Sequence, residues 1–288
     1  MKLNTKVALE STVITHGLPH PVNLEIAREM QAAVREGGAE PAVLAILDGK
    51  VQVGLSETQL QDLAARKELR KCSLRDLPVM GLTQEWGGTT VSATLFLALQ
   101  AGIQVFATGG IGGIHRGDDF DISADLPALA SLPGTVVCAG AKSILDLAKT
   151  RERLETDGVT VLGWQTNEFP AFYSRESGLP VDQRVETAEE VALIIQERNA
   201  YGLKQSILVA VPCPEPNALP FNEMEQIIAS AGMEADAMNI RGKALTPFLL
   251  HHVAKATEGR SLMANRALLC NNARVAAEIA LAFSKSNT

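Results

Sequence analysis

The chain has 288 residues, with 26 Lys or Arg against 33 Asp or Glu, which gives a formal net charge of −7. This acidic balance, the absence of a Lys/Arg-dense stripe and an aromatic content of 4% exclude a nucleic-acid-binding protein that relies on counterion release or base stacking. A small anionic ligand stays possible, because a local cationic pocket needs only a few side chains.

Cysteine usage and hydropathy indicate the compartment. Cys72, Cys138, Cys213 and Cys270 are far apart and form no C-x-x-C pair, so we expect small, buried, reduced side chains. No apolar run approaches the ~18 residues of a membrane span, and residues 1–5 lack the apolar core of a signal peptide. These features predict a cytoplasmic protein without a membrane partner.

Short apolar runs alternate with amphipathic stretches along the whole chain. Strands are expected at Lys6–Leu9, Ala42–Leu47, Val51–Gly54, Val79–Leu82, Val105–Thr108, Thr135–Ala139, Thr160–Trp164 and Ser206–Val211. Helices are expected at Asn23–Glu36, Glu57–Arg66, Thr90–Gln100, Ser143–Thr150, Ala188–Tyr201, Glu223–Ala231, Pro247–Thr257 and Arg266–Ser284. Asp48-Gly49 between two apolar runs predicts a tight hairpin. The alternation predicts an α/β fold with a mostly parallel sheet, in one domain spanning residues 1–288.

A carboxylate and two hydroxyls directly follow the first apolar run, in the stretch ALESTVITHG from Ala8. The carboxyl ends of strands in open α/β sheets line the binding crevice, so Glu10 is a candidate acid or base. The residues alone favour a plainer alternative, in which Glu10 caps a helix or lies on the surface.

Two further stretches carry groups suited to an anion. Lys71 and Arg75 stand four residues apart before Pro78, where a solvated loop is the ordinary alternative to an anion site. In GGTTVS from Gly87, glycines lead into a helix start whose free N–H groups would bind an anion, unless Thr89 is simply the N-cap.

The densest glycine stretch is ATGGIGGIHRG from Ala107, where glycines after a strand let the backbone approach a ligand closely. It is not a dinucleotide fingerprint, because His115 stands where the last glycine of G-x-G-x-x-G is required. The next segment, DDFDISAD from Asp118, gathers carboxylates suited to a partly hydrated divalent cation. An Asp-rich turn in which Ser123 caps a helix is an equal alternative.

Lys142 lies where a buried strand is expected to turn into a helix. It is not a P-loop lysine, because Val136 and Ala141 occupy the positions of the two required glycines. A helix N-terminus disfavours a positive charge by typically ~0.3–1 kcal/mol at exposed sites, and partial burial adds to this, so the neutral, nucleophilic amine is favoured. A lysine whose stem packs while its head reaches solvent is the alternative. Its place at a strand end makes Lys142 the strongest single catalytic candidate.

Taken in order, these segments closely resemble the pseudouridine-5′-phosphate glycosidase family, from Ala8 to about Ala280. The resemblance is carried by ALESTVITHG from Ala8, SLRDLP from Ser73, FATGGIGGIHRG from Phe106, FDISAD from Phe120, CAGAKSILD from Cys138 and TPFLL from Thr246. Each motif alone is modest evidence, whereas all of them in one order are strong evidence.

The resemblance implies a three-layer α/β/α fold and reversible cleavage of pseudouridine 5′-phosphate to uracil and ribose 5-phosphate, with degradation as the physiological direction. It also implies one Mn²⁺ per subunit and a homotrimer. By position, the Schiff-base lysine is Lys142, the proton donor is Glu10 and the metal carboxylate is Asp121. The implied substrate contacts are Lys71, Val91, His115, Ser123, Ala124, Asp125 and Asn265.

The chemistry accounts for these residue types. The scissile bond joins ribose C1′ to a uracil carbon, so protonation of a leaving oxygen or nitrogen cannot break it, and an ordinary pair of glycosidase carboxylates does not suit the task. An iminium formed by Lys142 on the opened ribose supplies an electron sink next to that carbon, and Glu10 shuttles protons.

Two segments depart from the family pattern: Val211-Pro212-Cys213-Pro214 replaces an Asn-Pro pair, and Gln84–Gly88 replaces a Lys/Asn-rich loop.

Two alternative functions stay open. One is a Schiff-base lyase or aldolase that acts on another phosphorylated sugar, and the other is a non-catalytic homologue of the indigoidine-synthesis type. Joint retention of Glu10, Lys71, Asp121 and Lys142 weighs against the second.

Overall fold

The computed structural model describes residues 5–117, 120–240 and 245–286. Its strands are β1 (Lys6–Leu9), β2 (Glu40–Leu47), β3 (Lys50–Val53), β4 (Arg70–Cys72), β5 (Gly87–Thr89), β6 (Val105–Ala107), β7 (Ile114–His115), β8 (Thr135–Cys138), β9 (Leu145–Asp146), β10 (Thr160–Trp164), β11 (Gln183–Val185) and β12 (Ile207–Ala210). A ten-stranded sheet has the order β11-β10-β12-β8-β6-β1-β2-β5-β4, with β3 paired to β2, while β7 and β9 pair separately.

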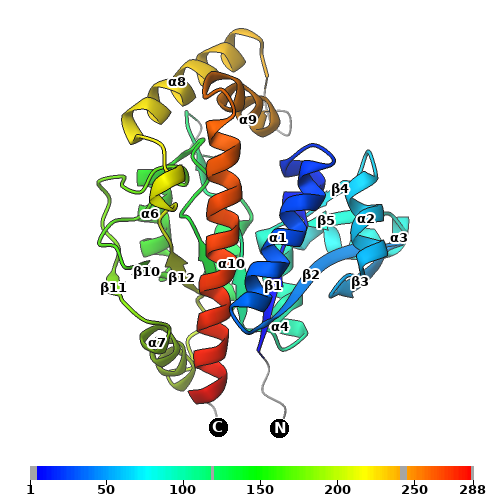
Figure 1. The fold of residues 1–288 in the computed structure, drawn as a ribbon, viewed down its shortest axis with the longest axis vertical. Helices are drawn as coiled ribbons and strands as arrows, with labels where there is room; N and C mark the ends of the chain where they lie inside the picture. Colours follow the sequence, from blue (N-terminus) through cyan, green and yellow to red (C-terminus); the bar gives the residue numbers. More distant parts are fainter. Residues whose placement is uncertain (1–4, 118–119, 241–244, 287–288) are drawn as a thin grey trace.

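The helices cover both faces of this sheet (Figure 1). They are α1 (Val22–Glu36), α2 (Glu57–Ala65), α3 (Leu77–Thr83), α4 (Val91–Gln100), α5 (Asp125–Ser131), α6 (Leu147–Thr156), α7 (Ala188–Ala200), α8 (Phe221–Ala237), α9 (Leu245–Ala256) and α10 (Arg260–Ser286). On one face, α10 packs between α1 and α7, and α4, α5 and α6 lie on the other. The expected three-layer α/β/α fold with a mostly parallel sheet is confirmed.

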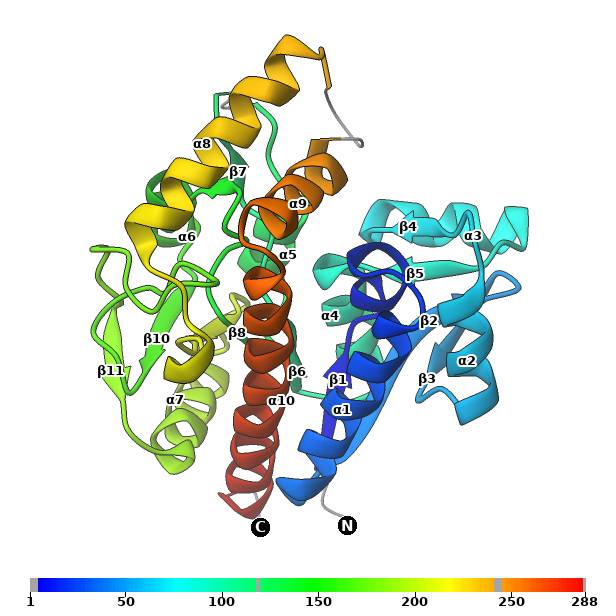
Figure 2. The ribbon, with the colours of Figure 1, turned by 45° about the horizontal axis from the view of Figure 1, so that its top comes forward.

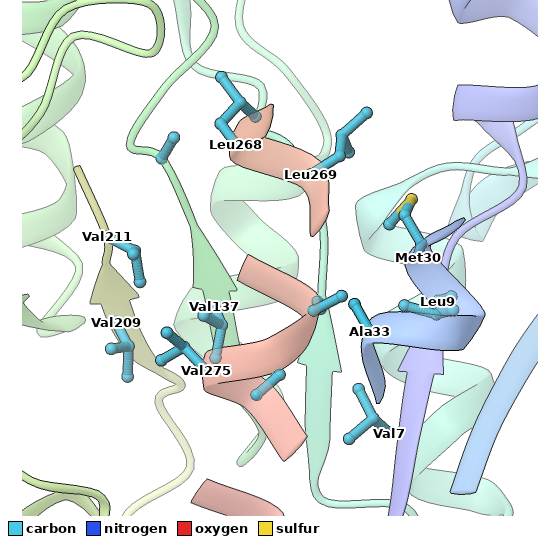
Figure 3. Close-up of a cluster of buried hydrophobic side chains, with 14 of the residues drawn as sticks. Val7, Leu9, Met30, Ala33, Val137, Val209, Val211, Leu268, Leu269 and Val275 are labelled. Carbon is cyan, nitrogen blue, oxygen red and sulfur yellow. The ribbon is translucent and has the colours of Figure 1, made fainter. Parts of the chain in front are cut away.

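Two apolar cores lie on opposite faces of the sheet because side chains alternate along each strand. On β1, Val7 and Leu9 join the core under α1 and α10, whereas Ala8 joins the core under α4. Figure 3 shows the first core, where Val137 and Val275 meet between the sheet and α10. Strands that are apolar on both faces are typical of a buried parallel sheet, which explains why the expected runs were nearly continuous.

β2 is longer than β1, and its extension positions β5 and β4 near the end of β1. Lys6–Leu9 pairs in parallel with residues 40–43, so β2 continues beyond the carboxyl end of β1. That extension pairs in antiparallel fashion with β5, through Ala45 opposite Gly88. β5 therefore runs back toward the end of β1, and β4 follows it in parallel. Figure 2 shows β4 and β5 beside the upper end of β1.

Most expected elements are present, and two differ for identifiable reasons. Residues 79–82, expected as a strand, lie in α3, because the Asp76 carboxylate accepts from Ser73 N at 2.9 Å and from Ser73 Oγ at 2.7 Å and starts a helical turn. The helix expected from Ser143 begins only at Leu147, where the Asp146 side chain accepts from Lys149 N at 3.0 Å as N-cap.

Several local expectations are confirmed. Asp48 and Gly49 have φ of 48° and 70°, the left-handed backbone that a two-residue hairpin between β2 and β3 requires. Cys72, Cys138 and Cys213 are buried, and desolvation raises the pKa of the Cys138 thiol to about 12, whereas Cys270, on α10, is only half-buried and does not meet the expectation. Within the described residues, no helix combines the length and apolarity needed to cross a membrane.

The contact between α1 and α10 is close enough to require a glycine. A Cβ added at Gly37, just after α1, would lie 2.6 Å from Ala277 Cβ on α10. We expect Gly37→Ala to lower the free energy of unfolding by ~1–3 kcal/mol, as overpacking does. Gly232→Ala in α8, where no atom lies within 4 Å of the new Cβ, should instead stabilise by ~0.5–1 kcal/mol. Denaturant unfolding measures both changes.

A double-mutant cycle tests whether the contact with Ala277 is the cause of the lost stability. If the clash with Ala277 is the cause, Gly37→Ala combined with Ala277→Gly loses less stability than the sum of the two single variants. Strict additivity would show that the crossing of α1 and α10 is not where the cost arises.

Candidate active site

The candidate site lies where three neighbouring parallel strands end. Glu10 follows β1, Thr108 follows β6, and Lys142 comes four residues after β8. β6 lies between β1 and β8 and is parallel to both. The carboxyl ends of such strands meet at one edge of the sheet, so the fold brings these side chains to the same edge.

Glu10 is a buried carboxylate with two hydroxyl donors. Its side chain is 4% exposed. Thr108 Oγ1 donates to Glu10 Oε1, and Thr12 Oγ1 donates to Glu10 Oε2. Burial of a carboxylate is costly unless its oxygens are hydrogen-bonded, and these two donors meet that need. Glu10 is therefore held in place at a strand end, and the helix-cap and surface alternatives are wrong.

The segment Thr108–Gly113, here called the glycine loop, also holds Lys142. Ile111 N donates to Gly140 O at 3.0 Å, and Lys142 N donates to Ile111 O at 3.0 Å. The loop begins with the threonine that binds Glu10, so the candidate proton donor and nucleophile are attached to the same short stretch of backbone. The segment after it is β7, which agrees with the rejection of a dinucleotide fingerprint.

Asp125 connects the glycine loop to the start of α4. Asp125 is 5% exposed, and its carboxylate accepts from Gly112 N at 2.8 Å and from Ser92 N at 3.0 Å. The second bond is made by the residue directly after Val91, the first residue of α4. Asp125 N in turn donates to Ser123 Oγ at 3.2 Å.

The residues Ser123, Ala124 and Asp125 thus form the turn into α5, with Ala124 exposed. The glycine at position 112 is required by close approach, because a Cβ there would lie 2.1 Å from Ser123 Oγ. Ser123 is not the N-cap of α5, because Ala124 occupies that position, although the Ser123 hydroxyl accepts from Asp125 N in the preceding turn. Asp125 supports the site through its backbone partners.

Lys71 shows that the predicted residues converge. It lies in β4, partly exposed to solvent, and its pKa is lowered chiefly by desolvation and next by repulsion from Lys142. The carboxylates of Asp125 and Glu10 oppose this and raise the pKa of Lys71. These influences indicate that Lys71 lies within Coulombic range of all three groups.

His16 explains how β4 is held there, and the motif analysis gave it no role. Its Nε2 lies 3.0 Å from Leu69 O, and its Nδ1 lies 2.6 Å from Thr15 Oγ1. A carbonyl can only accept, so Nε2 carries the proton that it donates to Leu69 O. His16 therefore fastens the turn after Glu10 to the residue just before β4.

His115 and Asp121 lie side by side. His115 Nδ1 is 3.9 Å from Asp121 Oδ2, and His115 N donates to Asp121 O at 3.0 Å. The Asp121 side chain is 47% exposed. Across residues 5–117, 120–240 and 245–286, no three His, Cys, Asp or Glu side chains are arranged to enclose a metal ion. Asp118 and Asp119 lie outside the described residues.

The described residues suit a metal ion that keeps most of its water ligands, and not one that is enclosed by protein ligands. A closed protein cage is absent from the described residues, whereas an exposed single carboxylate suits a hard divalent cation that keeps most of its water. Asp121 fits such an ion, with His115 as its nearest basic neighbour.

α10 contributes the remaining residues. Asn272, fully buried, donates from Nδ2 to Thr108 O at 2.8 Å and to Gly109 O at 3.4 Å. Asn265 is partly buried and lies seven residues earlier, on the same helix face and toward the site end of α10. Thr12, Thr108 and Asn272 were not singled out from the sequence, although the first two lie inside motifs that carried the resemblance.

Val211, where the chain departs from the family pattern, is 1% exposed and lies in the core shown in Figure 3. Two interpretations of the site need correction. Lys142 does not precede a helix directly, because α6 begins at Leu147, so the argument from a helix terminus fails. Thr89 is not the N-cap of α4, because Thr90 occupies that position.

The Gln84–Gly88 departure also has a structural role. Trp86 Nε1 donates to Asp48 Oδ1 at 2.7 Å, and Glu85 pairs with Arg70 at 3.0 Å. These contacts attach the segment to the β2–β3 hairpin and to β4. The Gln84–Gly88 segment therefore contacts β4, the strand that contains Lys71.

Comparisons with known proteins agree on the family. The model of the family described as indigoidine synthase A like protein matches residues 2–282. A pseudouridine-5′-phosphate glycosidase of Caldanaerobacter subterraneus subsp. tengcongensis is 55% identical over 97% of this chain and 92% of its own length. An indigoidine synthase A-like protein of Thermotoga maritima has a crystal structure with a TM-score of 0.91 and 39% identity, over 97% of this chain and 93% of that one. A prealnumycin C-glycosynthase in complex with ribulose 5-phosphate also has a TM-score of 0.91, with 38% identity over 98% of this chain and 92% of that one.

The convergence of two lysines predicts a measurable coupling. Because the charge of Lys142 helps to lower the pKa of Lys71, we expect Lys142→Gln to raise the pKa of Lys71. An NMR titration of ¹³Cε-labelled lysine measures the change, and Lys285→Gln, in the last turn of α10, is the matched control with no effect. An unchanged Lys71 titration in Lys142→Gln would contradict the placement of the two side chains in one site.

Proposed function

The chain belongs to the family of indigoidine synthase A like proteins that includes the pseudouridine-5′-phosphate glycosidases, and from this we propose that it cleaves pseudouridine 5′-phosphate to uracil and ribose 5-phosphate. The observation that carries the proposal is the gathering of Glu10, Lys71 and Lys142 at one edge of the sheet. The prealnumycin C-glycosynthase with bound ribulose 5-phosphate supports a sugar-phosphate substrate and chemistry at a C-glycosidic bond.

The proposed reaction uses one amine and one carboxyl group. Glu10 gives a proton to the ring oxygen as the ribose opens, and Lys142 Nζ bonds to C1′. The proton that Lys142 Nζ loses on forming this bond returns to Glu10. The bond between C1′ and the uracil carbon then breaks, Glu10 protonates the electron pair left on that carbon, and the nitrogen lone pair of Lys142 forms an iminium with C1′. Water adds to the iminium and releases ribose 5-phosphate. The sum is substrate plus water giving the two products.

The remaining residues have supporting roles in this proposal. Lys71 offsets the negative charge of the phosphate inside a protein of net charge −7. A bound phosphate would raise the pKa of Lys71 and so favour its cationic form. His115, Ser123, Ala124, Asn265 and the backbone of Val91 are proposed substrate contacts.

Manganese is proposed at Asp121, and when bound it supplies positive charge next to the phosphorylated sugar. The homotrimer, the cytoplasmic location and degradation as the main direction also stay proposals. Degradation is favoured because uracil released into dilute solution does not readily return to the site.

The first prediction concerns substrate and nucleophile together. Purified protein with Mn²⁺ should release uracil from pseudouridine 5′-phosphate, and Lys142→Ala should lower kcat by at least about 10³-fold, the order expected when a nucleophile is lost. Chromatography measures uracil, and borohydride with ribose 5-phosphate should add one reduced pentose phosphate to Lys142, seen by mass spectrometry. Lys149→Ala, on α6, is the matched control.

The other outcomes of this assay separate the alternatives. Uracil released equally by Lys142→Ala would keep the reaction but remove the Schiff base. No uracil from folded, metal-loaded wild type would reject this substrate and favour another phosphorylated sugar. The same assay started from uracil and ribose 5-phosphate gives the equilibrium, and net synthesis at cellular concentrations would overturn the proposed direction.

A second prediction concerns the metal. A single exposed carboxylate binds a hydrated cation weakly, so dialysis against a chelator should lower kcat/KM, and added Mn²⁺ should restore it in a saturable way. Asp121→Asn should shift that saturation to higher Mn²⁺ concentration by about tenfold or more, while Asp182→Asn, paired to Arg151 outside the site, should not. Full activity of the chelated enzyme would refute the proposed cofactor.

A further inference from the structure

We propose that Thr108 and Asn272 are positioning residues that hold the Glu10 carboxylate in its working orientation. This inference rests on the proposed glycosidase function, in which Glu10 transfers protons. Neither residue was among the site residues implied by the motifs, and both are buried, with 0% exposure. They form a chain of hydrogen bonds from α10, through the first residue of the glycine loop, to Glu10 Oε1.

The hydrogen bonds to Glu10 fix the orientation of its carboxylate. A glutamate has several side-chain torsions, and in a buried site its orientation depends on its partners. Thr108 donates to one oxygen of Glu10 and Thr12 to the other, so the plane of the carboxyl group is defined from both sides. Thr108 is β-branched and stiff at χ1, which makes it a precise donor.

The second step fixes Thr108 itself. β6 ends at Ala107, and the next two residues still bond to the segment of β8, through Thr108 N to Val137 O at 3.0 Å and Ala139 N to Gly109 O at 2.8 Å. Asn272 Nδ2 donates to the carbonyl oxygens of both residues. The two carbonyls can only accept, so the NH₂ group of Asn272 must face them. Asn272 thereby holds the peptide group that sets the direction of the Thr108 side chain.

The cost of keeping Asn272 supports a functional reason for it. Its neighbours Leu268, Leu269 and Ala273 are buried and apolar, and Asn272 Oδ1 has no hydrogen-bond partner in the described part of the chain. A buried amide with an unpaired oxygen lowers stability compared with an apolar residue of similar size. A purely structural helix packing would be served by leucine, whereas positioning of Thr108 requires a donor.

The test separates positioning from folding. We expect Thr108→Val, nearly identical in shape, to lower kcat at least about tenfold with KM within twofold of wild type, because the donor to a charged acceptor is lost. Thr108→Ser, which keeps the hydroxyl, should recover most of kcat. Asn272→Leu should lower kcat in the same manner, with KM within twofold of wild type.

Thr257→Val is the matched control. Thr257 is also fully buried, and its hydroxyl donates to Val253 O at 2.8 Å, away from Glu10. It should lose stability and retain kcat.

Each other outcome overturns the inference. If wild type releases uracil while Thr108→Val and Asn272→Leu keep kcat within twofold, neither residue positions Glu10. Equal losses of kcat in Thr257→Val, or failure of Thr108→Ser to recover activity, would assign the effect to folding. If Thr108→Val does not fold, Asn272→Leu decides alone by the same split between kcat and KM. Failure of the proposed function is distinct, because wild type itself would then release no uracil.

Discussion

The backbone of the glycine loop is the constraint on which the rest of the site depends. The Thr108 hydroxyl at the start of the loop donates to Glu10, Ile111 O accepts from Lys142 N, and Gly112 N donates to Asp125. Buried backbone N–H and C=O groups need partners, and in this loop Lys142 N and the Asp125 carboxylate supply two of them. One short segment therefore anchors residues from three separate parts of the chain.

The electrostatics of the site follow from this arrangement. Two lysines and two buried carboxylates share a small region, and the pKa of Lys71 responds to all of them. The two carboxylates, Glu10 and Asp125, are buried, where water screens their charges less. In a protein of net charge −7, Lys71 and Lys142 bring positive charge to this edge of the sheet, which suits a phosphorylated substrate.

α10 connects stability to the site. Its apolar face fills the core between α1 and α7, and the same face presents Asn272 to the carbonyls of the glycine loop. The long helix is therefore both the main packing element of one layer and a support for the catalytic loop. Substitutions on this face are expected to report on both properties, which is why a comparison of kcat with thermal stability is informative.

Sequence alone determined the α/β class, because apolar runs and amphipathic stretches alternate at the periods of strands and helices. It also determined Glu10, Lys71, Lys142 and Asp125 as candidates, because their motifs keep a fixed order. Only the tertiary structure decided which partners these residues have. Thr108 and Asn272 stand 164 residues apart, and no local pattern relates them. Likewise, residues 79–82 are apolar enough for a strand, yet the Ser73–Asp76 turn starts a helix there. Local propensity is encoded by neighbouring residues, whereas the contacts that orient a buried carboxylate arise only when distant segments pack together.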